Sequence, residues 1–189
     1  MRLAAGALVL LLAAGEAAAA QLAGVSLPDD ATVGDKHLVL NGLGLREATV
    51  LMVDVYVAGL YVESKTTDPA AILAPSAPKQ IVMKFVRSVG KEKLVEAWTE
   101  GFGKNAKDRA AAAAPGLAQL NAAMTDVKKG DVVALTFLPG KGTTVSVKGR
   151  DAAPIPGDDF ATVLFSIWLG PDPPNVGLRE GLLGRNAKP

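Results

Sequence analysis

The stretch from Asn41 to Glu63 constrains the fold more than any other part of the chain. Its glycine-rich start predicts a turn at residues 42–44 that places one arginine, Arg46, and the apolar run that follows predicts a long strand over residues 50–63. Strands that are apolar on both faces are usually buried. This strand carries Tyr56, so burial would bring a phenol close to an arginine.

Residue types alone leave two interpretations of Arg46 and Tyr56 open. The two side chains could form the floor of a pocket that holds an anion by charge and by hydrogen bonds. Alternatively, Arg46 pairs with Asp54 or Glu47, and Tyr56 only packs in the core.

The N-terminus predicts an exported protein. Arg2 supplies a short positive region, residues 4–15 are largely apolar, and an Ala-x-Ala motif ends at Ala20. We expect residues 1–20 to be a cleaved signal peptide and residues 21–189 to form one domain in the periplasm or otherwise outside the cytoplasm. An uncleaved anchor is the alternative, although the apolar run is short for a membrane span, and we expect no span after signal cleavage.

Composition argues against several classes of site. The chain has no cysteine and one histidine, His37, which leaves no disulfide framework, thiolate metal site or histidine metal cluster. The net charge is +1, and no basic stripe interleaved with aromatic residues indicates nucleic acid. The Gly-x-Ser-x-Gly elbow of many hydrolases is missing. We expect no metal and no cofactor, and we expect Trp98 and Trp168 to be core residues because each lies on an apolar helix face.

The hydrophobic pattern predicts an α+β fold. A bulge or a close approach of another segment is expected at Gly59. Residues 104–114 suit a helix or a mobile surface segment that Pro115 ends, and Asp158 or Asp159 is expected to cap the last long helix. Strands are predicted over residues 37–45, 50–63, 79–86, 131–138, 143–148 and 151–155, and helices over residues 68–73, 91–102, 117–127, 160–169 and 176–183.

Four motifs follow one another along the chain in a specific order. They are LNGLGLR at 40–46, DVYVAGLYVE at 54–63, KGDVVALTFLPGKGTTVSVKG at 129–149 and FATVLFSIWLG at 160–170, with REGLLG near the end. This series resembles the chalcone isomerase superfamily and, more narrowly, its bacterial, signal-bearing branch. The resemblance implies an open-faced β-sandwich, in which helices cover one face of a large antiparallel sheet.

The resemblance allows the catalytic positions of the plant-type isomerase to be compared one by one. That enzyme closes a chalcone into a flavanone, with an arginine on the oxyanion and hydroxyl groups that polarise the ketone. The arginine falls on Arg46 and is retained, whereas the hydroxyl and amide positions fall on Tyr56 and near Lys93, Glu100 and Ile167. Each lost oxyanion donor removes a few kcal/mol of stabilisation, so we expect no catalytic residue for flavanone formation. Lys93, Glu100 and Ile167 are retained as cleft-lining candidates.

The fatty-acid-binding members of the superfamily carry an arginine and a tyrosine that match Arg46 and Tyr56. The resemblance implies that this pair holds a carboxylate head group while the alkyl chain lies in an apolar cleft. We therefore expect an exported protein that binds a fatty acid or a similar apolar carboxylate. Two alternatives stay open: an intramolecular lyase for a phenolic, chalcone-like or other enone substrate with Arg46 as oxyanion anchor, and an envelope domain with a vestigial cleft. The sequence indicates no particular oligomeric state.

Overall fold

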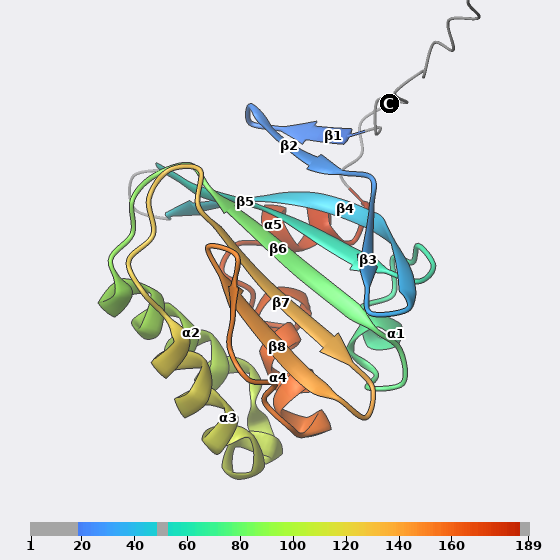
Figure 1. Ribbon diagram of the computed structural model, residues 1–189, viewed down its shortest axis with the longest axis vertical. Helices are drawn as coiled ribbons and strands as arrows, with labels where there is room; N and C mark the ends of the chain where they lie inside the picture. The colour runs from blue at the N-terminus through green and yellow to red at the C-terminus, as the bar shows by residue number, and fades with distance from the viewer. Residues whose placement is uncertain (1–18, 49–52, 186–189) are drawn as a thin grey trace, which may run out of the picture.

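A computed structural model of the protein describes residues 19–48 and 53–185. Seven antiparallel strands form one sheet in chain order, β3 to β9, beside a separate hairpin, β1-β2 (Figure 1). The strands are β1 (Ala19–Leu22), β2 (Val25–Pro28), β3 (Asp30–Val33), β4 (Lys36–Ala48), β5 (Val53–Val62), β6 (Lys79–Phe85), β7 (Val132–Leu138), β8 (Gly142–Val147) and β9 (Arg150–Asp151). The helices are α1 (Pro69–Leu73), α2 (Lys91–Asn105), the 3-10 turn η1 (Lys107–Arg109), α3 (Ala110–Ala123), α4 (Asp158–Leu169) and α5 (Val176–Leu182).

The main core lies between the sheet and its helices. It joins inward-facing residues of β5 to β8 to the apolar faces of α2, α3, α4 and α5, and α4 is buried along nearly its whole length. The opposite face of β5 carries a smaller cluster in which Val57 packs with Val25 and Leu27 of the β1-β2 hairpin. The expected α+β, open-faced sandwich is confirmed.

The predicted turn at residues 42–44 is wrong, because Gly42 and Gly44 lie inside β4. A Cβ atom on Gly42 would overlap the carbonyl oxygen of Gly181, and one on Gly44 would overlap that of Leu178. Both acceptors belong to α5, which packs its backbone directly against the strand. The two glycines therefore allow α5 to pack closely against β4, and the strand continues through them to Arg46.

Gly59 has the close approach that its sequence context predicted. It pairs in regular register with Val82, and a Cβ atom there would lie 2.8 Å from Cδ1 of Leu27. The irregularities of the sheet lie in the β4-β5 pair instead, between Leu40 and Gly42 and just after Arg46.

Three further expectations differ from the structure. Pro115 does not end a segment but lies within α3, where a buried Ala113 and a Gly116 pressed against the Phe160 ring hold the helix on α4. The helix that was predicted to reach residue 127 ends at Ala123. The predicted strand over 151–155 reduces to the end of β9 and one isolated bridge at Ile155.

Of the two predicted helix caps, the one at α1 agrees with the structure and the one at α4 differs. Asp68 caps α1 as predicted, since its Oδ1 accepts a hydrogen bond of 2.9 Å from the backbone N–H of Ala70. The N-cap of α4 is Gly157, whereas Asp158 and Asp159 occupy the first turn, where carboxylates interact favourably with the helix dipole. Residues 49–52, with the start of the predicted strand 50–63, lie outside the described residues, as does most of the predicted signal peptide.

Lys79 closes the other end of α1 from inside the core. Its side chain is only 2% exposed, and Nζ donates hydrogen bonds to the carbonyl oxygens of Ile72 (2.7 Å) and Ala74 (2.6 Å). Burial lowers the pKa of Lys79 to about 8. The ammonium group therefore has a structural role, because it satisfies carbonyls that a helix end leaves without partners.

The contact between β4 and α5 gives a stability prediction. Gly44→Ala should lower the free energy of unfolding by about 1–3 kcal/mol, since the added methyl group must push backbone atoms apart. Gly103→Ala is the matched control, because nothing lies within 4 Å of a Cβ atom at this position in α2 and alanine favours a helix. Urea unfolding followed by circular dichroism measures both. Equal stability of Gly44→Ala and the unmodified protein would contradict the close packing.

Candidate functional site

Arg46 and Tyr56 lie directly opposite each other on the neighbouring strands β4 and β5. Opposite residues on antiparallel strands point to the same face of the sheet. Tyr56 belongs to the main core beneath the helices, so Arg46 lies on the helix-covered face as well. A shift of register follows between Arg46 and Glu47, and such bulges often redirect side chains beside functional sites.

Tyr56 is held firmly in place. Its side chain is 7% exposed, its ring packs edge-on against Phe85 at 5.4 Å, and its hydroxyl oxygen accepts a 3.0 Å hydrogen bond from Nε1 of Trp168. Burial raises the pKa of Tyr56 to about 12, although the Trp168 hydrogen bond and the charge of Arg46 act in the opposite direction. The phenol is therefore neutral at physiological pH, and the bond from Trp168 does not use the hydroxyl proton.

Arg46 is partly buried, and its guanidinium donates a hydrogen bond to the carbonyl oxygen of Glu47. Within residues 19–48 and 53–185, no ion pair involves Arg46. Its strand partner is Tyr56, and Asp54 lies opposite Glu47 instead. The pairing with Asp54 or Glu47 that residue types allowed is thus reduced to a contact with the backbone carbonyl of Glu47, and in the described part of the chain no carboxylate forms a direct ion pair with Arg46.

The three cleft-lining candidates lie in different environments. Lys93 and Glu100 are exposed on α2, where they pair with Glu96 (2.7 Å) and Lys104 (2.6 Å). The pKa of Glu100 is lowered mainly by Lys104 and slightly by Arg46, which indicates that the Arg46 charge reaches this helix.

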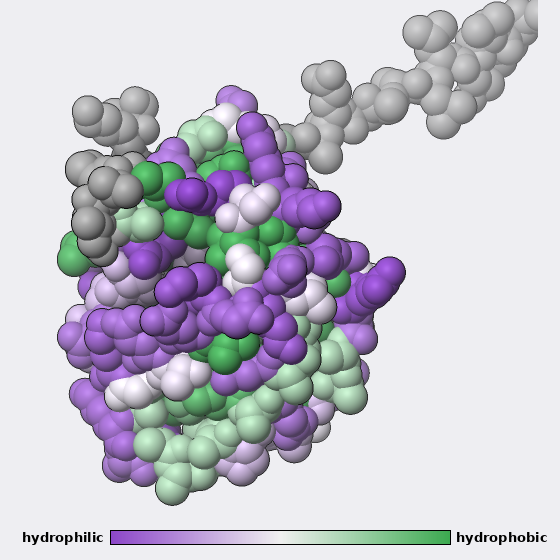
Figure 2. All heavy atoms as spheres, turned by 90° about the vertical axis from the view of Figure 1, so that its left-hand side faces the viewer, coloured by the Kyte–Doolittle hydropathy of each residue, from purple (hydrophilic) through white to green (hydrophobic). Residues whose placement is uncertain are grey.

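Ile167 is buried between α4 and α2, and a Cβ atom on Gly101 would lie 2.8 Å from its Cγ2. Figure 2 shows a largely hydrophilic band over the middle of this side of the molecule and a mildly hydrophobic surface below it, where the alanine-rich α3 lies. A role for these three residues in a cleft stays a prediction.

Sequence reasoning missed the part that the tryptophans play. Trp168 was expected only to fill the core, yet it donates to Tyr56 across 112 residues of sequence. Trp98 packs edge-on against Trp168, with ring centres 5.4 Å apart at an angle of 62°. The regular apolar stripe of residues 160–168 indicates that Trp168 is buried, but it does not indicate which strand residue contacts its indole ring.

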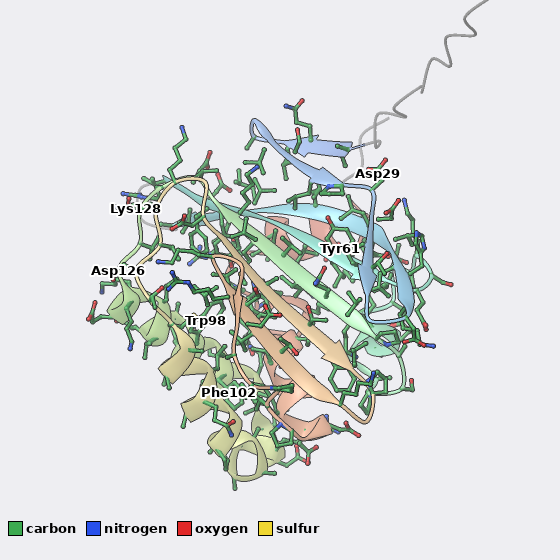
Figure 3. All side chains as sticks on the ribbon, viewed as in Figure 1. Asp29, Tyr61, Trp98, Phe102, Asp126 and Lys128 are labelled. Carbon is green, nitrogen blue, oxygen red and sulfur yellow. The ribbon has the colours of Figure 1, made fainter. Side chains whose placement is uncertain are left out.

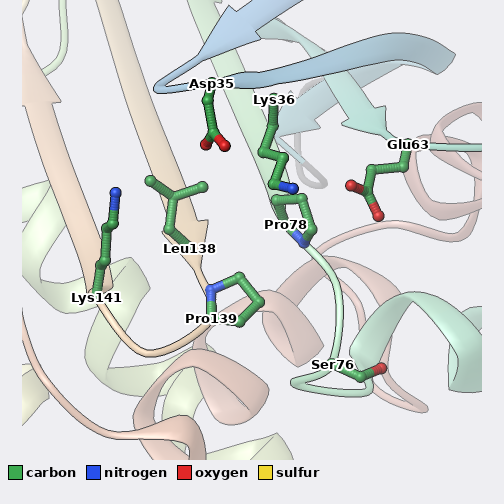
Figure 4. A pocket seen from close by; sticks show the side chains of 8 residues that line it. All are labelled: Asp35, Lys36, Glu63, Ser76, Pro78, Leu138, Pro139 and Lys141. Carbon is green, nitrogen blue, oxygen red and sulfur yellow. The ribbon is translucent and has the colours of Figure 1, made fainter.

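Two surface pockets lie at the opposite end of β5 from Tyr56. One has a volume of about 340 Å³ and the other about 320 Å³, and they share Glu63 and Pro78. Neither is lined by Arg46 or Tyr56, and the space beside Tyr56 is occupied by the rings of Phe85 and Trp168. The first pocket is lined by Asp35, Lys36, Glu63, Ser76, Pro78, Leu138, Pro139 and Lys141 (Figure 4).

The described residues were also compared with the requirements of a metal site and of a membrane-spanning helix. In residues 19–48 and 53–185, no group of three or more His, Asp or Glu side chains is placed to hold a metal ion. None of the helices there combines the length and hydropathy needed to cross a membrane.

Comparison with known proteins identifies the family. A family model described as chalcone isomerase-like matches residues 19–184. The chain belongs to the chalcone isomerase-like family. A crystal structure of a fatty-acid binding protein from Arabidopsis thaliana resembles this family member with a TM-score of 0.72 and 18% sequence identity, over 88% of this chain and 96% of that chain. At this identity the likeness shows the shared fold, and no curated protein matches the sequence.

The hydrogen bond in the core of this chalcone isomerase-like protein can be tested by a double-mutant cycle. Tyr56→Phe should cost about 1–3 kcal/mol of unfolding free energy, because it leaves the Trp168 N–H buried without an acceptor. The loss of unfolding free energy in the double variant Tyr56→Phe/Trp168→Phe should be smaller than the sum of the losses in the two single variants, by about 0.5–1.5 kcal/mol. Denaturant unfolding of the four proteins gives the coupling, and strictly additive losses would argue against the bond.

Proposed function

We propose that the protein binds a fatty acid or a similar apolar carboxylate, with the head group held by Arg46 and Tyr56. One observation carries the proposal: the two side chains lie directly opposite each other on the helix-covered face of the sheet. Arg46 brings a charge that no described carboxylate pairs with, and Tyr56 brings a hydroxyl proton that its bond with Trp168 does not use.

The chemistry of the two groups suits an anion with an apolar tail. A carboxylate accepts charge-assisted hydrogen bonds from a guanidinium and further bonds from a neutral phenol. The pKa of Tyr56, raised to about 12 by burial, keeps the phenol a donor over the physiological range. Phe85, Trp168 and Ile167 supply the buried apolar surroundings in which an alkyl chain gains affinity.

The comparison with a solved structure supports the ligand class. The Arabidopsis thaliana protein of the same fold is described as a fatty-acid binding protein. In the present structure the rings beside Tyr56 are packed together, so a ligand would have to part the helices from the sheet at this point. Binding would then select a more open arrangement than the one described.

We also propose that the protein is exported and belongs to the signal-bearing branch of the family. The positive residue, the apolar run and the Ala-x-Ala motif that ends at Ala20 support this. Mature protein recovered from the periplasm of its native host should begin at Gln21 or within a few residues of it, and intact-mass spectrometry measures this directly. Soluble cytoplasmic protein that retains Met1 would contradict export.

Ligand binding gives the sharpest prediction for Arg46. Arg46→Ala should weaken the binding of dodecanoate by about 1.5–3 kcal/mol, because a hydrogen bond to a charged group is lost. Tyr56→Phe should weaken binding less, since it removes a neutral donor. Isothermal titration calorimetry measures both affinities.

Arg150→Ala is the matched control, since it removes the same charge from the exposed strand β9. Thermal melts of each variant separate a loss of binding from a loss of folding. Equal affinity of the unmodified protein and Arg46→Ala would refute the proposed role of this arginine.

A further inference from the structure

Trp98 holds a polar group that the fold does not satisfy. Its side chain is 4% exposed, and its Nε1 atom is buried without a hydrogen-bond partner among the described residues. A buried N–H group without an acceptor costs about 1–3 kcal/mol. Such groups are rare in native proteins, and one beside a binding site suggests that a ligand supplies the missing acceptor.

The two tryptophans of the chain differ in how they are anchored. Trp168 uses its N–H in the bond to Tyr56, so its ring is fixed both by packing and by a polar contact. Trp98, which projects from α2 into the core, touches the edge of Trp168 but has no polar contact of its own (Figure 3). Phe85, the other ring on Tyr56, has no donor to offer.

We propose that Trp98 is a third hydrogen-bond donor of the ligand site and that its ring moves when the head group enters. The inference rests on the proposed function, because it places the carboxylate between Arg46, Tyr56 and the indole N–H. The Trp98 ring packs edge-on against Trp168, whose indole N–H bonds to the Tyr56 hydroxyl, so Trp98 lies one ring away from the proposed head-group site.

This arrangement determines which head group the site prefers. A carboxylate offers about four acceptor positions on two oxygens, enough to accept from Arg46, Tyr56 and Trp98 together. A primary alcohol offers one oxygen with two acceptor positions. The site should therefore favour a fatty acid over the alcohol of the same chain length, and part of that preference should depend on Trp98.

Trp98→Phe tests the inference, because it keeps an aromatic ring and removes the N–H. We expect this variant to bind dodecanoate about tenfold more weakly than the unmodified protein and to bind dodecan-1-ol with nearly unchanged affinity, both measured by calorimetry. Phe102→Leu is the matched control: it alters the packing of the same helix face without touching a donor, and it should affect both ligands alike.

A spectroscopic measurement on the unmodified protein covers the case in which Trp98→Phe does not fold. The chain has two tryptophans, so its ¹H–¹⁵N spectrum contains two indole N–H signals, which a Trp168→Phe variant assigns. The Trp98 signal should move downfield on saturation with dodecanoate, as expected when an N–H gains an acceptor.

The outcomes separate the two proposals. If the unmodified protein binds dodecanoate but the Trp98 signal does not move, or Trp98→Phe binds it equally well, the role of Trp98 is refuted while the proposed function stands. An equal loss for both ligands also refutes it, since packing would then explain the effect. If the unmodified protein binds no dodecanoate at all, both proposals fail.

Discussion

The hydrogen bond from Trp168 to Tyr56 is the contact on which the arrangement of the site depends. Polar groups in an apolar core are costly unless they pair, so this bond fixes how α4 lies on β5. The Tyr56 ring then packs against Phe85, and Arg46 is its partner across the sheet. Burial keeps the phenol neutral, against the smaller opposing effect of this bond, which makes it a donor and unsuited to act as a base at physiological pH.

A second constraint brings Arg46 to this position. Gly42 and Gly44 allow the backbone of α5 to lie directly against β4, and the strand continues past that contact to Arg46. The sequence predicted a turn here. Two nearby glycines give the same local pattern in a turn, where they allow unusual backbone angles, and in a strand, where they allow another segment to pack closely. The deciding partner, Gly181, lies far along the chain, so no window around the glycines could reveal it. Pro115 was misjudged for a similar reason, since packing on α4 outweighs its local effect.

Where the signal is local, sequence and structure agree. The Asp68 cap, the hairpin of β7 and β8 and the end of α4 at Gly170 each depend on residues a few positions apart. At the site, the family resemblance predicted that Arg46 and Tyr56 lie close together, whereas their strand register and the contacts of Trp98 and Trp168 were not predicted. Those contacts join α2, α4 and β5, and amphipathic periodicity shows which face of a helix is buried but not what it meets.

We propose that an anion binds at Arg46 and Tyr56 and that aromatic rings close this place in the structure described. A crystal structure of the protein grown with dodecanoate tests it most directly. In that crystal we expect a carboxylate within hydrogen-bond distance of the Arg46 guanidinium and the Tyr56 hydroxyl, with α2 and its Trp98 ring displaced from their present positions. A fatty acid bound instead in the pockets beside Glu63 and Pro78, with the rings around Tyr56 unchanged, would contradict the account.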